Sequence, residues 1–253
     1  MRRAISIIVS PRACEHDWVR LRRPKGVLVD YGGTLVQETG YDPRLGHEFL
    51  LSRAAFVPSH ITPNDILHRA NRVSEEVASR RDEFHLETPW PALTRLIHEF
   101  LGIRFSHPLS DLELGFWKAS VTTEPIPGAR EALEEFQRNQ IPVGVVSNCS
   151  FQQEVIRHEL TKHGLDAPLA FIMVTADYAV RKPNVLLFET AAAKLGIEPR
   201  DIWFIGDRLD TDVAGARAAG MQPVWFGSTS GGEATDDILV APNWPAVMRF
   251  FRS

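Results

Sequence analysis

Three short apolar runs, each ending in a polar residue, most constrain the fold of this chain. The runs and the residues that follow them are Val27–Val29 with Asp30, Val143–Val146 with Ser147 and Asn148, and Ile202–Ile205 with Gly206 and Asp207. Short runs that are rich in β-branched residues and do not alternate with polar residues are typical of strands buried on both faces. They therefore predict a parallel sheet.

Helical patterns separate these runs. Apolar residues at helical spacing predict a helix over 129–136, Pro183 is expected in the first turn of a helix ending near Gly196, and 214–219 is expected to be a helix stopped by Gly220. Further strands are expected over 169–174 and 223–226, and a short strand and closing helix within 238–253. This alternation predicts a doubly wound, Rossmann-like α/β fold. Ligands of such folds bind beyond the carboxyl ends of the strands.

Residues 38–120 have a different pattern, with almost no strand-like run. Four helices are predicted there, over 45–56, 63–85, 91–101 and 109–119. We expect an α-helical cap over 38–120, inserted into a core made of 25–37 and 121–253. Because the insertion leaves and re-enters near the carboxyl end of the first strand, it is expected to sit above the crevice.

Charge and composition narrow the function classes. Residues 1–25 carry seven basic and two acidic side chains, so the rest of a chain of net charge −4 is acidic. This argues against broad nucleic-acid binding, and we interpret 1–24 as a basic, solvated extension. No apolar run approaches the roughly 18 residues of a membrane span. With two cysteines and a poor export signal, a cytoplasmic location is expected. The Gly/Ser/Thr-rich segment 227–235 is expected to be a mobile loop.

The segment Asp30-Tyr31-Gly32-Gly33-Thr34-Leu35 places one acid at the end of the first strand. Two glycines then let the backbone approach whatever that acid contacts. Asp30 is therefore a candidate nucleophile or metal ligand. The alternative is an aspartate that caps a turn, which is common at strand ends.

Four segments in this order are similar to the motifs of the haloacid dehalogenase-like hydrolase superfamily, in which a helical cap of the C1 type lies between the first two. They are Asp30–Leu35, Ser147-Asn148, Lys182-Pro183 and Gly206–Asp212. The resemblance covers nearly the whole chain from about residue 25. It implies a magnesium-dependent phosphatase that acts on a small phosphorylated molecule and requires neither nucleic acid nor membrane.

The resemblance also implies roles for individual residues. Asp30 is expected to be the nucleophile that forms an aspartyl-phosphate. The residues expected to act on the substrate beside it are Thr34 and Ser147 as hydroxyl groups, Lys182 as the cation that offsets the negative charges, and Gly33 and Asn148 as binding residues. The expected magnesium ligands are Asp30, Asp207, the backbone carbonyl of Gly32, and Asp212 directly or through water.

The chain departs from this pattern at Gly32, where phosphatases of the superfamily carry a second aspartate that protonates the leaving group. Four hypotheses follow. The substrate has a good leaving group, such as an acyl or aryl phosphate; a cap residue supplies the acid, with His47, Glu48, His85 and Glu87 as candidates; the chemistry is of the phosphonatase or dehalogenase type; or the protein binds a ligand without turnover. Asp207 and Asp212 argue against dehalogenation. The cap contains a single lysine, Lys118, at its end, which argues against the phosphonatase mechanism.

Overall fold

The computed structural model describes residues 23–166, 169–227 and 238–253. The expectations for 1–24 and 227–235 fall almost entirely outside these residues. The described chain forms a six-stranded parallel sheet in the order β10-β9-β8-β1-β6-β7. Its strands are β1 (Gly26–Val29), β6 (Val143–Ser147), β7 (Leu169–Val174), β8 (Ile202–Gly206), β9 (Gln222–Phe226) and β10 (Leu239–Ala241). The predicted parallel sheet is confirmed.

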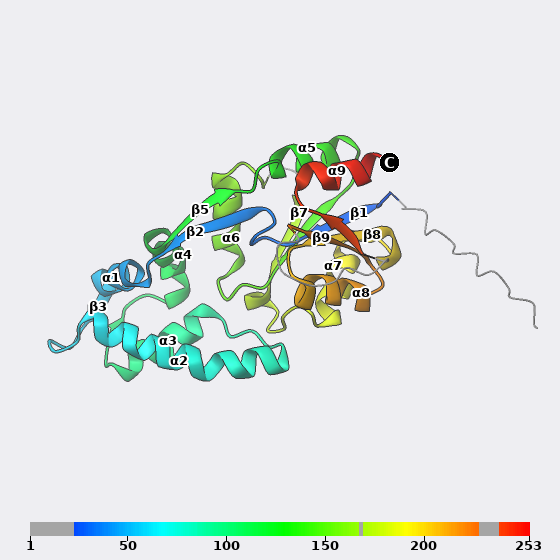
Figure 1. Ribbon diagram of the computed structural model, residues 1–253. Helices are drawn as coiled ribbons and strands as arrows, with labels where there is room; N and C mark the ends of the chain where they lie inside the picture. The colour runs from blue at the N-terminus through cyan, green and yellow to red at the C-terminus, as the bar shows by residue number, and fades with distance from the viewer. Residues whose placement is uncertain (1–22, 167–168, 228–237) are drawn as a thin grey trace, which may run out of the picture.

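Helices cover both faces of the sheet (Figure 1). One face packs against α5 (Ala129–Arg138), α6 (Gln153–Lys162) and α9 (Trp244–Arg252), and the other against α7 (Val185–Leu195) and α8 (Ala214–Ala218). The strands between them are apolar because each of their faces is covered; all four residues of β1 are buried. The doubly wound α/β prediction is confirmed.

The order of the sheet reverses at β1, which pairs with β8 on one side and β6 on the other. Such a switch point leaves a crevice beyond the carboxyl ends of the strands, because the following connections run to opposite faces. The residues that follow β1, β6 and β8 are therefore brought to one place by the topology alone.

Four helices are inserted between β2 (Val36–Tyr41) and β5 (Val121–Pro125), and we call residues 43–120 the helical insert. Its helices are α1 (Pro43–Arg53), α2 (Pro63–Phe84), α3 (Trp90–Phe100) and α4 (Leu109–Ser120). α2 begins with a capping box, in which Thr62 and Asp65 each accept a hydrogen bond from the other's backbone N–H. The insert has apolar clusters of its own, one of them around Leu50 and Phe116.

Two short antiparallel ribbons were not expected from the sequence pattern. β2 pairs with β5, and β3 (Ala54–Phe56) pairs with β4 (Arg104–Phe105). The helix expected over 45–56 is therefore wrong at its end, because Ala54–Phe56 is extended and pairs with a segment some 50 residues away in sequence. The expected core–cap boundary between residues 37 and 38 falls within β2.

Pro183 also lies differently from expectation. α7 begins after Asn184, whose side chain accepts a hydrogen bond from the N–H of Leu186, so Pro183 precedes the helix rather than occupying its first turn. The helix ends at Gly196, as expected, and Gly196 has a left-handed conformation.

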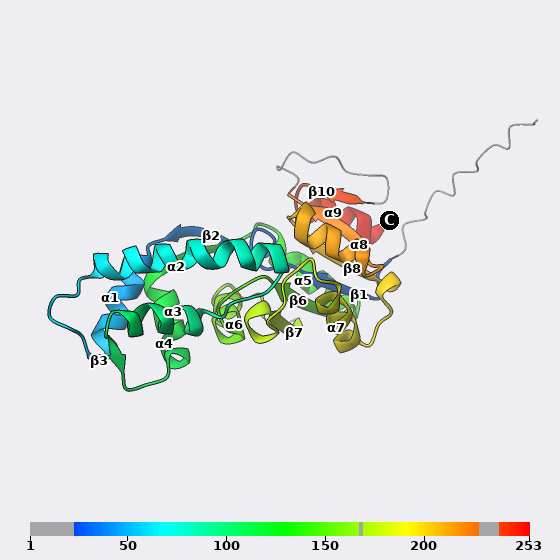
Figure 2. The same cartoon turned by 90° about the horizontal axis from the view of Figure 1, so that it is seen from below.

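The β2–β5 ribbon joins the helical insert to the sheet, and α2 runs back from the insert toward the sheet (Figure 1; Figure 2). No helix among the described residues combines the length and apolar composition that crossing a lipid bilayer requires.

Candidate active site

Asp30 is held at the carboxyl end of β1 by the sheet itself. Its backbone N–H donates to the carbonyl of Ile205 on β8 at 2.9 Å, which continues the strand pairing by one residue. The side chain is 7% exposed. A carboxylate this deeply buried requires a charged or hydrogen-bonding partner, because burial alone strongly disfavours its ionised form.

Lys182 is that partner. Its Nζ lies 2.6 Å from Asp30 Oδ1 and 2.6 Å from Asp212 Oδ1, and it donates to the carbonyl of Val146 at 2.9 Å. Lys182 is 3% exposed and Asp212 is 1% exposed. The ammonium group therefore connects the ends of β1, β6 and β8 within the protein interior.

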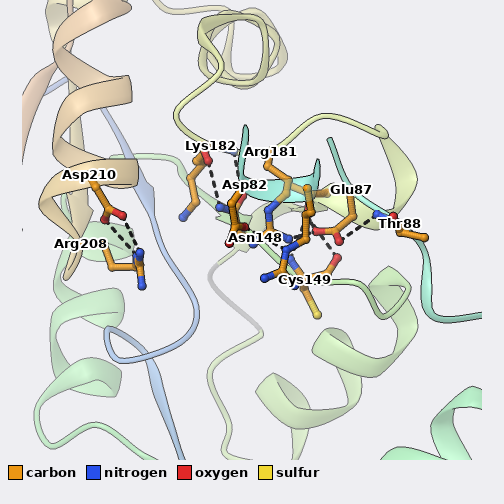
Figure 3. Close-up of polar contacts among 11 residues, drawn as sticks. Asp82, Glu87, Thr88, Asn148, Cys149, Arg181, Lys182, Arg208 and Asp210 are labelled. Atoms are coloured by element: carbon orange, nitrogen blue, oxygen red, sulfur yellow. Dashed lines mark hydrogen bonds and ion pairs between the residues drawn. The ribbon is translucent and has the colours of Figure 1, made fainter. Parts of the chain in front are cut away.

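Asn148 positions Lys182 through the backbone. Its Oδ1 accepts from the Lys182 N–H at 2.8 Å, and its Nδ2 donates to the Lys182 carbonyl at 3.1 Å (Figure 3). A side-chain amide that bonds both backbone groups of one residue fixes the start of that side chain. The sequence pattern indicated Asn148 as a binding residue and did not reveal this positioning contact.

The acidic cluster is electrostatically crowded. Burial raises the Asp30 pKa to about 7; the Lys182 ammonium opposes this rise, and the carboxylates of Asp212 and Asp207 add to it. Burial and the neighbouring Asp212 likewise raise the pKa of Asp207. Burial alone would lower the Lys182 pKa, but Asp212 and Asp30 together raise it. The cluster thus contains three carboxyl groups and one buried ammonium group, so it carries excess negative charge when the carboxyl groups are ionised.

A divalent cation fits this excess of charge. Asp30, Asp207 and Asp212 each offer an oxygen, and these atoms lie within 4.8 Å of one another. Asp207 Oδ1 is buried and has no hydrogen-bond partner among the described residues. Gly33, at φ +71°, allows Asp207 to come close, since a Cβ there would lie 2.6 Å from Asp207 Oδ2. Carboxylate oxygens suit a hard cation.

The cluster lines a cavity of about 550 Å³. The expected site residues that line it are Asp30, Gly32, Ser147, Asn148, Lys182, Asp207 and Asp212. Gly33 and Thr34 are not among its lining residues. The Gly33 N–H donates to the Val36 carbonyl at 2.9 Å. Thr34 is fully buried, its hydroxyl has no partner among the described residues, and its carbonyl accepts from Trp244 Nε1 at 2.9 Å.

Gly32 lines the cavity without a backbone reason to be glycine. Its φ is outside the left-handed region, and a Cβ built there would meet no atom within 4 Å. A larger residue would therefore fit, and the space beside Asp30 is open.

A sequence profile of the haloacid dehalogenase-like hydrolase family matches residues 113–226, which include the second, third and fourth motif segments. A phosphoglycolate phosphatase from Chromobacterium violaceum is 27% identical over 83% of this chain and 87% of its own length. The 2-haloacid dehalogenase of Pseudomonas syringae superposes with a TM-score of 0.61 over 89% of this chain and 97% of that structure, at 19% identity.

In sequence over residues 113–226, and in fold over most of its length, the chain resembles the haloacid dehalogenase-like hydrolases.

Other curated relatives match shorter stretches of the chain. A ribulose-1,5-bisphosphate 5-phosphatase from Halopiger xanaduensis is 26% identical over 51% of this chain and 54% of its own length. Across the first three curated relatives the chain spans between 39% and 54% of their length.

The helical insert contributes Arg81, Asp82 and His85 from the end of α2 to the cavity lining. Of the four expected acid donors, His85 is therefore the one that lines the cavity. The other three are used elsewhere: His47 is buried against His98, Glu48 pairs with Arg44 at 3.6 Å, and Glu87 is buried.

Glu87 forms a link between the insert and the core. Its Oε2 accepts from the Thr175 hydroxyl at 2.6 Å and pairs with the Arg181 guanidinium (Figure 3). The backbone adds two hydrogen bonds, from the Glu87 N–H to Ala179 O at 2.9 Å and from the Arg181 N–H to His85 O at 2.8 Å. Because Arg181 precedes Lys182, the link ties the insert to the segment that carries the site lysine.

Proposed function

We propose that the protein is a magnesium-dependent phosphatase of small phosphorylated metabolites that uses Asp30 as the nucleophile. The observation that carries the proposal is the position of Lys182, at 2.6 Å from both Asp30 and Asp212 at the end of the cavity. A cation there offsets the repulsion between an attacking carboxylate and an incoming phosphate. The names of the curated relatives, several of them phosphatases of small metabolites, support the same substrate class.

In this proposal Asp30 attacks phosphorus, the bond to the leaving group breaks, and water then hydrolyses the aspartyl-phosphate. Ser147, at the end of β6, donates its hydroxyl to a phosphoryl oxygen. Asp30, Asp207, Asp212 and the carbonyl of Gly32 would hold Mg²⁺, which when bound supplies positive charge against the phosphoryl oxygens. Lys182 remains protonated throughout, because its carboxylate neighbours raise its pKa.

The structure leads us to assign three expected residues to supporting roles. Asn148 holds the Lys182 backbone. Gly33 makes room for Asp207, since its own N–H is already bonded to Val36. Thr34 lies under the turn rather than along the cavity, so we assign it to stabilising the loop that carries Asp30.

Turnover of 4-nitrophenyl phosphate and acetyl phosphate, with Mg²⁺ and with a chelator, tests the proposal. We expect activity that depends on Mg²⁺ and is lost in Asp30→Asn. Equal rates for wild type and Asp30→Asn would refute it. Ligand-induced thermal stabilisation by phosphate esters without any turnover would instead favour the alternative of a protein that binds without catalysis, which Gly32 suggests.

A further inference from the structure

The side chain of Glu38 faces the cavity. Side chains alternate along a strand, so Glu38 lies on the same face of β2 as Val36, which is buried in the core. Directly across the ribbon lies Thr123, which is also buried and whose hydroxyl bonds to Glu159 on α6. Glu38 lines the same cavity as Asp30.

A local irregularity helps to aim this side chain. The register of the β2–β5 ribbon shifts between Glu38 and Gly40, so that Glu38 pairs with Thr123 and Gly40 pairs with Thr122. Bulges of this kind occur beside active sites, where the altered twist redirects a side chain. Glu38 therefore enters the cavity from the ribbon, while Asp30 enters it from the sheet.

Glu38 also differs from the other acids of the cavity wall. Its carboxylate accepts no hydrogen bond and forms no ion pair within the described part of the chain. By contrast, Asp82 accepts from Arg81 at 3.1 Å, and Asp210 forms a two-point pair with Arg208 at 3.1 and 2.6 Å. Acids engaged in this way are poor proton donors, because an adjacent cation favours the ionised form.

The surroundings of Glu38 favour its neutral form. Glu38 is exposed to solvent, but partial burial raises its pKa and the Glu159 carboxylate raises it further. The other titratable groups that face it, Tyr31, Tyr41 and Cys149, have raised pKa values themselves and so are uncharged near neutral pH. A carboxyl group that is protonated closer to neutrality can both give and take a proton.

We propose that Glu38 is the general acid and base of this enzyme, in the role that an aspartate at position 32 would otherwise have. The proposal rests on the phosphatase function proposed above. As Asp30 attacks phosphorus and the bond to the ester oxygen breaks, Glu38 transfers its proton to that oxygen and the alcohol leaves. Glu38 then takes a proton from the water that attacks the aspartyl-phosphate, which releases inorganic phosphate and restores both carboxyl groups.

The absence of a side chain at Gly32 is consistent with this arrangement. The space that a Cβ would occupy is open, so the leaving group has room between Asp30 and the ribbon. The acid therefore reaches the leaving group from a different backbone element.

Two aryl esters of similar shape test the proposal, because phenoxide needs a proton to leave and 4-nitrophenoxide does not. In Glu38→Gln, kcat/KM for phenyl phosphate is expected to fall about 100-fold, while kcat/KM for 4-nitrophenyl phosphate falls less than tenfold. In wild type, kcat/KM for phenyl phosphate should decline at alkaline pH as Glu38 loses its proton, and this decline should disappear in Glu38→Gln. Glu124→Gln is the matched control. It makes the same change on the facing strand at an exposed position outside the cavity lining, and both rates should stay within twofold of wild type.

A second substitution provides a rescue. Adding Gly32→Asp to the Glu38→Gln variant should raise kcat/KM for phenyl phosphate at least tenfold above that of Glu38→Gln alone, because position 32 accepts a side chain. An equal loss on both esters, or a leaving-group effect that appears in Asp82→Asn or His85→Gln instead, would overturn the role of Glu38. Turnover that requires Asp30 but not Glu38 counts against this inference alone. Turnover that survives Asp30→Asn counts against the phosphatase itself.

Discussion

The two walls of the cavity are built differently. The wall from the sheet buries the charges of Asp30, Lys182 and Asp212, and Lys182 is 3% exposed with carboxylates on two sides. The wall from the helical insert exposes them, with the Arg81 and Asp82 side chains 37% and 67% exposed. Buried, mutually bonded groups hold one geometry, whereas exposed pairs contribute little energy and can change freely. We infer that the sheet sets the chemistry and the insert sets the choice of substrate.

The largest expected effect comes from removing the cation of the sheet wall. Lys182→Met should lower kcat for 4-nitrophenyl phosphate by about 10³-fold, or about 4 kcal/mol, because the attacking carboxylate and the phosphate then repel each other without compensation. Steady-state kinetics together with a thermal melt measure the change and show whether the variant is folded.

Lys118→Met is the matched control from the insert. Lys118 is the insert's single lysine and is exposed at the end of α4. Its substitution should leave kcat within twofold of wild type. A folded Lys182→Met variant that keeps more than a tenth of wild-type kcat would contradict the division of roles between the two walls.

The next largest effect is expected from removing the Glu87–Arg181 ion pair, which connects the two walls. Glu87→Gln removes a buried charge from Arg181, whose side chain is 17% exposed, and should cost about 2 kcal/mol in the free energy of unfolding. KM should rise more than kcat falls, because the insert loses its link to the core while Lys182 keeps its partners. Urea denaturation and steady-state kinetics measure the two effects.

Asp210→Asn offers a comparison for that change. Asp210 and Arg208 form a pair at the cavity mouth with side chains 66% and 61% exposed. Its loss should cost less than about 0.5 kcal/mol, since water replaces most of an exposed ion pair. If both variants lose the same stability, Glu87 is no stronger a link than a surface pair.

The two walls also differ in how well they could be predicted from the sequence. The ends of β1, β6 and β8 were predicted because buried strands leave continuous apolar runs, and the fold brings such ends together. The strand over 169–174 was predicted at its observed bounds for the same reason. The sheet wall is thus encoded by local patterns.

Other features depend on contacts that local patterns do not contain. α6 was not predicted, and the β2–β5 ribbon, rich in exposed residues, has no apolar alternation to reveal it. The link from Glu87 to Arg181 spans 94 residues. Glu38 faces the cavity because of a pairing with Thr123, 85 residues away in sequence. The end of α1 was predicted wrongly because Ala54–Phe56 is held as a strand by Arg104–Phe105. Long-range pairing overrides local helical preference there.

The insert also buries the histidines His47 and His98, but unlike Lys182 they are kept neutral. This contrast gives the smallest expected effect. His47 is 4% exposed, and burial lowers its pKa to about 4, with a further contribution from His98. Because the unfolded chain binds a proton near pH 6.5 and the folded chain does not until about pH 4, stability falls as the pH drops through this window. From pH 7.5 to 5.5 the loss due to His47 should be roughly 1.4 kcal/mol.

Comparison with His47→Phe isolates this contribution. Burial raises the Glu113 pKa to about 7, so Glu113 changes stability in the opposite direction over part of the same range in both proteins. His98, whose pKa is also lowered, acts equally in both. The quantity to measure is therefore the difference in the free energy of unfolding between wild type and variant, by urea denaturation at pH 7.5 and pH 5.5. The variant should gain roughly 1.4 kcal/mol relative to wild type at the lower pH. A difference that does not change with pH would mean that His47 titrates in the folded protein as it does in the unfolded chain, and that burial in the insert does not hold it neutral.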